Sequence, residues 1–282
     1  MRIDSHVHIV GPPDRYPQIS ERKYLADVAA VHILRRLGSE RGISRFVVVQ
    51  PSFYGTDNTA TLDALDALGD AGRGVAVIDP ADTGDEMLSD FDRRGVRGLR
   101  INLYSQLSGP PLGSLEERFS PVAKIAGMMN WHVQVIAPLA TLLASAEVFA
   151  RSRVPLIVDH YGIYGRARPD SAEGRRLLEL LGMPHVWIKV SAPYRVFDNP
   201  LQTQPDKEWL AAIVAAARDH CVWGSDWPFT PPQDRQKGAA LPASYRAIGY
   251  GNLVEDFLAA LPSPDLADRI MIDNPARFYG FD

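Results

Sequence analysis

Cysteine, long apolar runs and an excess of either charge are all scarce in this sequence. Its single cysteine, Cys221, cannot form a disulfide within the chain, which is typical of a reducing compartment, and a buried apolar role is expected for it. The apolar segments are far shorter than the roughly 20 residues that a membrane-spanning helix needs, and no basic stretch followed by an apolar one begins the chain. These absences predict a cytoplasmic protein that does not contact a membrane.

The charged residues are balanced and interspersed, with 30 basic and 34 acidic side chains. A nucleic-acid-binding surface needs clustered basic residues, so none is expected here. The predicted partner is a small molecule, and the sequence leaves open the assembly of a homo-oligomer.

Short apolar segments recur along the chain, separated by stretches with helical spacing. Most are continuous runs of valine, isoleucine and leucine, as expected for parallel strands that are covered on both faces. They are residues 2–9, 45–50, 73–78, 98–102, 132–136, 156–159, 186–190 and 221–224. Eight such units predict an α/β protein with a single domain, a (β/α)₈ TIM barrel over residues 1–282. An open doubly wound sheet is the alternative, but no G-x-G-x-x-G turn follows a strand.

Polar side chains gather where these predicted strands end, which is where such barrels carry their active sites. The first strand contains Asp4-Ser5-His6-Val7-His8, and alternation along a strand makes His6 and His8 point the same way. Two imidazoles on one face can bind a metal or a substrate oxygen. Further polar residues at the ends of later strands are Gln50, Tyr54, Asn58, Arg100, Asn102, His160, Arg195 and Asp226. Each alone has a structural explanation, but together they predict a hydrolytic site.

Eight motifs extend this pattern over almost the whole chain, from Ile3 to Phe281. In order they are D-S-H-V-H, V-V-Q-P-S-F-Y-G-T-D-N, G-V-R-G-L-R-I-N, W-H-V, V-D-H-Y-G, K-V-S-A-P-Y-R, W-G-S-D-W-P and D-N-P-A-R. The sequence thereby resembles the amidohydrolase superfamily (amidohydrolase 2 type), in the branch of the 2-pyrone-4,6-dicarboxylate, sugar and muconate lactonases. The resemblance implies a (β/α)₈ barrel with a central constellation of His6, His8, His160 and Asp226.

Ester hydrolysis is the chemistry that this constellation suits. The three histidines would polarise a lactone carbonyl, directly or through a metal, and Asp226 would activate water. The prediction is a lactonase, a hydrolase acting on a carboxylic ester bond. Three alternatives are a lactone isomerase, in which a substrate hydroxyl attacks instead of water, a metal-dependent decarboxylase of the same superfamily, and a binding protein without turnover.

The resemblance also implies substrate contacts from Arg100, Arg195 and Tyr24, and a guanidinium matches the planar fork of a carboxylate. Two positions depart from the branch, because Gln106 stands in place of an arginine and Ile136 in place of a tyrosine. Loss of one charge-assisted contact costs roughly 1.5–3 kcal/mol. The favoured substrate is therefore a lactone with one carboxylate, or an aldonic or aldaric lactone.

The hydroxyls of such a sugar lactone would be met by further polar residues of the predicted rim. They are Gln50, Asn58, Asn102 and Gln106, and Tyr54 is a further candidate for substrate binding.

The sequence is compatible with a site that binds one metal ion and with a site that needs none. His6, His8, His160 and Asp226 could bind one zinc ion, as in some members of the superfamily, whereas the resembled lactonase branch works without metal. The fifth strand offers no glutamate, lysine or histidine toward the site, so a bridged two-metal centre is not expected. A site that requires no cofactor is favoured over one divalent metal. His132, at the start of that strand, is expected to have a structural role.

Overall fold

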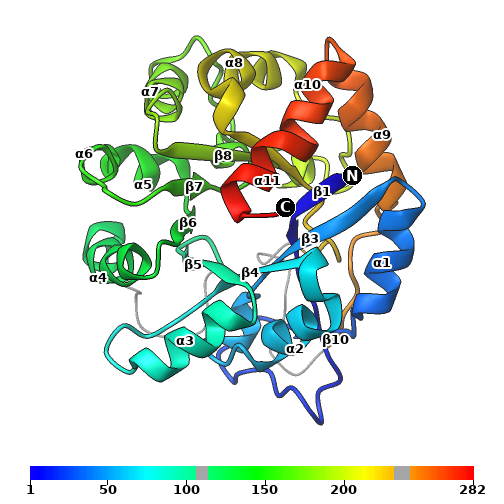
Figure 1. The fold of residues 1–282 in the computed structure, drawn as a ribbon. Coiled ribbons are helices and arrows are strands. Elements are labelled where there is room, and N and C mark those ends of the chain that lie inside the picture. The colour runs from blue at the N-terminus through cyan, green and yellow to red at the C-terminus, as the bar shows by residue number, and fades with distance from the viewer. Residues whose placement is uncertain (106–113, 232–241) are drawn as a thin grey trace.

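Eight parallel strands form the centre of the molecule and helices surround them (Figure 1). The computed structural model describes residues 1–105, 114–231 and 242–282. The strands, in their order around the sheet, are β1 (Arg2–Val7), β3 (Ile43–Val49), β4 (Gly72–Ala76), β5 (Val96–Asn102), β6 (His132–Ile136), β7 (Leu156–Val158), β8 (Val186–Ser191) and β9 (Cys221–Gly224). Every predicted strand overlaps one of these, and the predicted (β/α)₈ barrel is confirmed.

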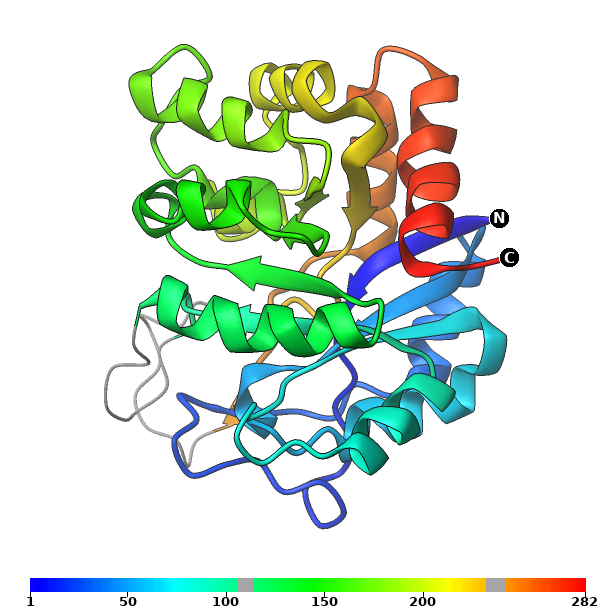
Figure 2. The same cartoon turned by 60° about the vertical axis from the view of Figure 1, so that its left-hand side comes forward.

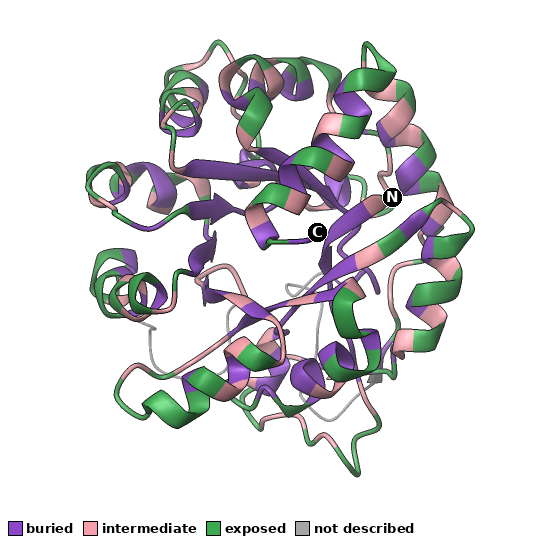
Figure 3. Cartoon of the chain, in the orientation of Figure 1, coloured by how far each residue is buried: buried purple, intermediate pink, exposed green. Residues whose placement is uncertain are grey.

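Helices cover the outside of the barrel. Their buried faces are turned toward the strands, as Figure 3 shows. In α7, for example, Leu177 and Leu181 are fully buried, at the four-residue spacing of one helical face. The helices are α1 (Val31–Ser39), α2 (Thr59–Leu68), α3 (Asp85–Arg93), α4 (Leu115–Met128), α5 (Leu139–Ala144), α6 (Ala146–Ala150), α7 (Ala172–Leu181), α8 (Lys207–Ala217), α9 (Tyr250–Ala260), α10 (Pro264–Asp268) and α11 (Asn274–Tyr279). A separate two-stranded parallel ladder joins β2 (Leu25–Ala26) to β10 (Pro242–Ala243).

The barrel closes between its first and last strands. Past the end of β9, the backbone N–H of Asp226 donates to the carbonyl of His6 at 2.8 Å, and the N–H of His8 donates to the carbonyl of Trp227 at 2.7 Å. The closure therefore places Asp226 beside both histidines of β1.

The opposite end of the barrel is covered by the C-terminal segment, which lies beside the start of β1 in both views (Figures 1 and 2). Tyr279 and Phe281 pack there in one cluster with Ile3. The ring of His132 lies 4.6 Å from that of Phe278, centroid to centroid, and burial lowers its pKa to about 3. This packing supports the structural role predicted for His132.

Two smaller expectations concern Cys221 and membrane contact. Cys221 is buried and free, and burial raises the pKa of its thiol, as expected for an inert apolar role. Among the described residues, no helix is long and apolar enough to cross a bilayer.

Candidate active site

Four side chains predicted from the sequence meet at the carboxyl ends of the strands. Nε2 of His8 lies 3.3 Å from Oδ1 of Asp226, and Nε2 of His6 lies 3.6 Å from the same oxygen. Nε2 of His160 is 3.9 Å from it. The two imidazoles of β1 approach each other to 3.3 Å between their Nε2 atoms. All four residues are buried, so their interactions are screened little by water.

The backbone is unusual at two of these residues. His160 has φ 49° and Asp226 has φ 62°, in the left-handed region that few residues other than glycine adopt. Such conformations cost of order 1–3 kcal/mol and occur preferentially at functional sites. The hydrogen bond from Asp226 to His6 and a 2.8 Å contact between Nδ1 of His160 and Oγ of Ser191 hold the two residues there.

The two oxygens of the Asp226 carboxylate have different surroundings. Oδ2 accepts hydrogen bonds of 2.7 Å from the hydroxyl of Tyr194 and from Nε of Arg195. Oδ1 is buried and has no hydrogen-bond partner among the described residues. Burial alone would raise the pKa of Asp226, but the charge of Arg195 outweighs it and holds the pKa well below its usual value. Asp226 is therefore ionised at neutral pH, with one oxygen available.

The pairing with Asp226 adds a role to Arg195, which the sequence analysis assigned to the substrate. Nη2 of Arg195 lies 2.6 Å from Oδ2 of Asp226 and donates to Oγ1 of Thr230 at 2.8 Å. The guanidinium thus orients the carboxylate and also reaches the cavity described below.

The imidazoles of the site are held neutral or fixed in orientation. Burial, reinforced by the charge of Lys189, keeps the pKa of His6 well below 6.5, and burial lowers that of His160 to about 3. Nδ1 of His8 lies 2.7 Å from the carbonyl oxygen of Val49. A carbonyl only accepts, so this nitrogen carries a proton, and in the neutral ring of His8 the Nε2 atom is then bare.

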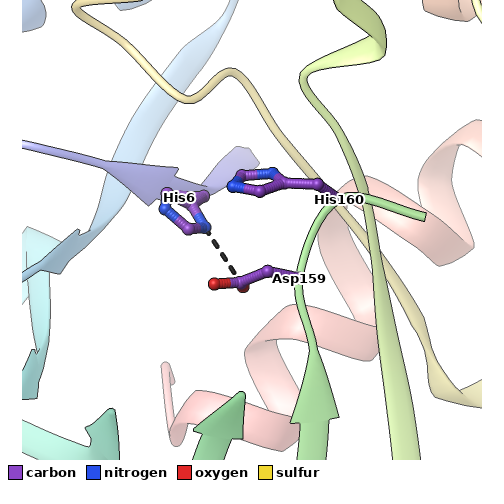
Figure 4. Close-up of side chains that lie close together, drawn as sticks. All are labelled: His6, Asp159 and His160. Carbon is purple, nitrogen blue, oxygen red and sulfur yellow. Dashed lines mark ion pairs between the residues drawn. The ribbon is translucent and has the colours of Figure 1, made fainter. Parts of the chain in front are cut away.

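A second polar group lies beneath the histidines and consists of Asp159, Gln134 and Lys189. The sequence analysis assigned it no role. Oδ1 of Asp159 is 3.4 Å from Nδ1 of His6 (dashed in Figure 4). Nζ of Lys189 is 3.3 Å from the same nitrogen and 2.7 Å from Oε1 of Gln134. Nε2 of Gln134 donates to Oδ2 of Asp159 at 2.9 Å. The signal available in the sequence was a long polar side chain inside a mostly apolar strand, Gln134 in β6 and Lys189 in β8.

The charges of this second group compensate one another. Burial lowers the pKa of Lys189 to about 8. Burial would raise the pKa of Asp159, but His6 and Lys189 outweigh it and hold the pKa well below normal. Nζ of Lys189 also lies 5.9 Å from the centre of the Tyr279 ring, so the ammonium stands between the C-terminal segment and the active-site histidines.

A small, partly open cavity of about 20 Å³ lies above the site, with room for little more than one water molecule. It is lined by His8, Tyr24, Pro51, Ser52, Phe53, Arg100, Ser105, Ile136, His160, Arg195 and Thr230. Five predicted site residues are among them, whereas His6 and Asp226 lie behind the lining. Nη1 of Arg100 donates to the carbonyl of Gln50 at 3.0 Å, and its buried Nε has no partner among the described residues. Burial raises the pKa of Tyr24 to about 12, so it faces the cavity as a neutral phenol.

Four predicted substrate contacts have other partners in the structure and do not line the cavity. The amide of Gln50 donates to the carbonyls of Gly55 and Asp57. Asn58 binds the backbone of Val77, Oδ1 of Asn102 accepts from the N–H groups of Tyr104 and Ser105, and the hydroxyl of Tyr54 accepts from Gly11.

These four side chains hold loops in place, because the loop N–H and carbonyl groups need partners once they are buried. Gln106 lies outside the described residues, and Ile136 lines the cavity as an apolar side chain.

The donor atoms of the site fit one divalent metal ion. Two groups qualify, His6 with His8 and Asp226, and His6 with Asp159 and His160, each with its ligand atoms within 4.8 Å of one another. A tetrahedral zinc site with Zn–N distances of about 2.0–2.1 Å places its ligand atoms about 3.3 Å apart. The 3.3 Å and 3.6 Å separations in the first group are close to that value, and the unpartnered Oδ1 of Asp226 suits a cation.

Comparison with known proteins gives a consistent result. A family model described as amidohydrolase matches residues 3–281. The 4-sulfomuconolactone hydrolase of Hydrogenophaga intermedia is 28% identical over 98% of this chain and 88% of its own. The D-galactarolactone isomerase of Agrobacterium fabrum is 27% identical over 87% of this chain and 79% of its own.

A solved structure extends the similarity to three dimensions. The crystal structure of a probable 2-pyrone-4,6-dicarboxylic acid hydrolase from Acinetobacter baumannii, with citric acid bound, superposes with a TM-score of 0.79. It is 25% identical to this chain, and the match covers 99% of both chains.

Proposed function

Because this chain belongs to the amidohydrolase family, we propose that it is a lactonase, which opens the ring ester of a carboxylate-bearing or sugar lactone with water. The observation that carries the proposal is the free oxygen of Asp226, ionised, buried and surrounded by His6, His8 and His160. The relatives support a lactone as the substrate, since one is named a 4-sulfomuconolactone hydrolase and another a D-galactarolactone isomerase.

Asp226 would act as the general base. A water bound to its Oδ1 adds to the lactone carbonyl, and the proton of that water passes to Oδ1 as the new C–O bond forms. The tetrahedral intermediate then breaks the ring C–O bond, and Asp226 returns the proton to the leaving oxygen. The low pKa of Asp226 keeps it ionised before each turnover, while Tyr194 and Arg195 hold its other oxygen in place.

The carbonyl oxygen gains negative charge during attack and needs hydrogen-bond donors nearby. His160 and Arg100 line the cavity and can supply them. The hydroxyl of Ser191 can donate to Nδ1 of His160, which would leave the proton of this neutral imidazole on Nε2, 3.9 Å from Oδ1 of Asp226.

A divalent metal, if bound, would be held by Nε2 of His6, Nε2 of His8 and Oδ1 of Asp226, and it would supply Lewis-acid polarisation and a more acidic water. We favour hydrolysis without a required metal, because the chain's own hydrogen-bond donors can serve the same oxyanion. The hydrogen-bond chain described below, which engages Nε2 of His6, supports the same choice.

Substrate selection would depend on the cavity lining. Arg100 and Arg195 present guanidinium groups that suit a carboxylate, and Tyr24 adds a phenolic hydroxyl. Ile136 is apolar and offers no further hydrogen bond. One carboxylate, or the hydroxyls of an aldonic or aldaric lactone, therefore fits this lining better than a planar dicarboxylate.

The test is turnover of a panel of pyrone dicarboxylate, muconolactones and sugar lactones by protein whose bound metals have been quantified. We expect ring opening of a carboxylate-bearing or sugar lactone, and a fall in kcat of about 10² or more in Asp226→Asn. Near-normal turnover by that variant would remove Asp226 from the mechanism. A product that is another lactone would indicate an isomerase, and release of carbon dioxide would indicate a decarboxylase.

A further inference from the structure

Four groups form a continuous line of hydrogen-bonding atoms beneath the cavity. Nζ of Lys189 lies 3.3 Å from Nδ1 of His6. Nε2 of His6 lies 3.3 Å from Nε2 of His8, and Nδ1 of His8 lies 2.7 Å from the carbonyl oxygen of Val49. Every member is buried. The positions of the protons in this line follow from the chemistry of its two ends.

The carbonyl end determines the protonation of His8. Because Val49 accepts, Nδ1 of His8 carries a proton, and in the neutral ring its Nε2 is bare. Nε2 of His6 can then bond to His8 only as the donor, so it must carry the proton of the neutral His6 ring. That leaves Nδ1 of His6 bare, as an acceptor for the ammonium of Lys189.

Electrostatics at the centre of the site are consistent with the same arrangement. The bare Nε2 of His8 and the ionised Oδ1 of Asp226 are both acceptors, and they lie 3.3 Å apart. Their lone pairs repel each other unless a positive group stands between them. Nε2 of His6 is 3.3 Å from the first atom and 3.6 Å from the second, so its N–H can donate to His8 while its positive end also lies near the carboxylate.

A metal at this place would require a different tautomer. A neutral imidazole binds a metal through its unprotonated nitrogen, and its other N–H commonly donates to a carboxylate. His6 would have to carry its proton on Nδ1, with Oδ1 of Asp159 as the acceptor at 3.4 Å. That oxygen is without a hydrogen-bond partner among the described residues, and the ammonium of Lys189 lies 3.3 Å from Nδ1 of His6 and 3.7 Å from the oxygen.

We propose that Lys189 is a positioning residue that holds His6 in the Nε2–H tautomer and thereby opposes metal binding. The proton of His6 then occupies the place that a divalent ion would take between His8 and Asp226. Lys189 and Asp159 compete for Nδ1 of His6. The balance between them decides whether the site contains the proton of His6 or a divalent ion. The inference concerns the site of the proposed lactonase but does not depend on the substrate.

The tautomer is measured directly on the wild-type protein. In ¹⁵N-histidine-labelled, metal-free protein at pH 7.5, His6→Asn identifies the His6 signals. We expect a protonated Nε2 and an unprotonated Nδ1 for His6, and the reverse pattern for His8. A proton on Nδ1 of His6 would overturn the proposal whatever the catalytic activity, and this measurement remains decisive if the variants below do not fold.

Zinc affinity provides the second measurement, by competition with a chelating dye. We expect Lys189→Met to bind zinc about 10–100-fold more tightly, the range found when outer partners of metal ligands are changed. Asp159→Asn, which loses the carboxylate acceptor, should bind it more weakly. Lys124→Met removes a lysine charge from the exposed face of α4 and should match wild type.

These outcomes separate the inference from the proposed function. Unchanged zinc affinity in a folded Lys189→Met variant would show that Lys189 does not oppose the metal. A protein that opens no lactone but gives the expected tautomer and zinc response would instead reject the lactonase proposal alone.

Discussion

At the scale of single residues, the proposed mechanism predicts that the pairing of Arg195 with Asp226 sets the acid limb of the pH–activity profile. Burial favours protonation of Asp226, and the guanidinium outweighs it. Arg195→Met should raise the pKa of Asp226. Hydrolysis of a neutral lactone needs the ionised base. On acidification the variant should therefore lose activity at a higher pH than the wild type. Arg195→Lys, which keeps the charge, should shift the limb less. The pH profile of kcat/KM measures this, and identical acid limbs in all three proteins would contradict it.

At the scale of elements, β5 and β6 approach so closely that only glycine fits at Gly98. A Cβ atom there would lie 2.3 Å from Nε2 of His132, whose ring is confined by Phe278 and Tyr279. Gly98→Ala should therefore reduce the free energy of unfolding by about 1–3 kcal/mol, measured by urea denaturation. Gly182→Ala is the control, because a Cβ there meets ordinary contacts of 3.4 Å or more. Equal stabilities would show that the ring of His132 moves aside freely.

At the scale of the whole molecule, the C-terminal segment closes the barrel beneath the active site. Tyr279 is fully buried there, and its hydroxyl has no hydrogen-bond partner among the described residues. Tyr279→Ala should lower the free energy of unfolding by about 3–5 kcal/mol through lost burial and the cavity left behind. Tyr279→Phe keeps the ring and should be close to wild type. Urea denaturation again measures the change. Similar losses of unfolding free energy in both variants would show that the hydroxyl, and not the ring, provides the stabilisation.

The strands were predictable because their signal is local. A parallel strand covered on both faces is a continuous apolar run, and residues 132–136 and 221–224 were located with the bounds that the structure has. Strict alternation was less reliable along β1. Its pairing with β3 is irregular between Asp4 and Val7, so Asp4 binds Tyr250 and Ser225 while His6 enters the active site.

By itself the sequence determined the barrel, the rim at which polar groups meet, and, through its motifs, Asp226 and the three histidines around its free oxygen. These follow from periodicity and from the order of strands, which are properties of neighbouring residues. Only the tertiary structure decided the partners of each group. Arg195 pairs with Asp226, and Lys189 reaches His6, because strands far apart in the chain become adjacent when the barrel closes. The proton of a histidine is placed by whichever donor or acceptor then faces it, and no local pattern contains that information.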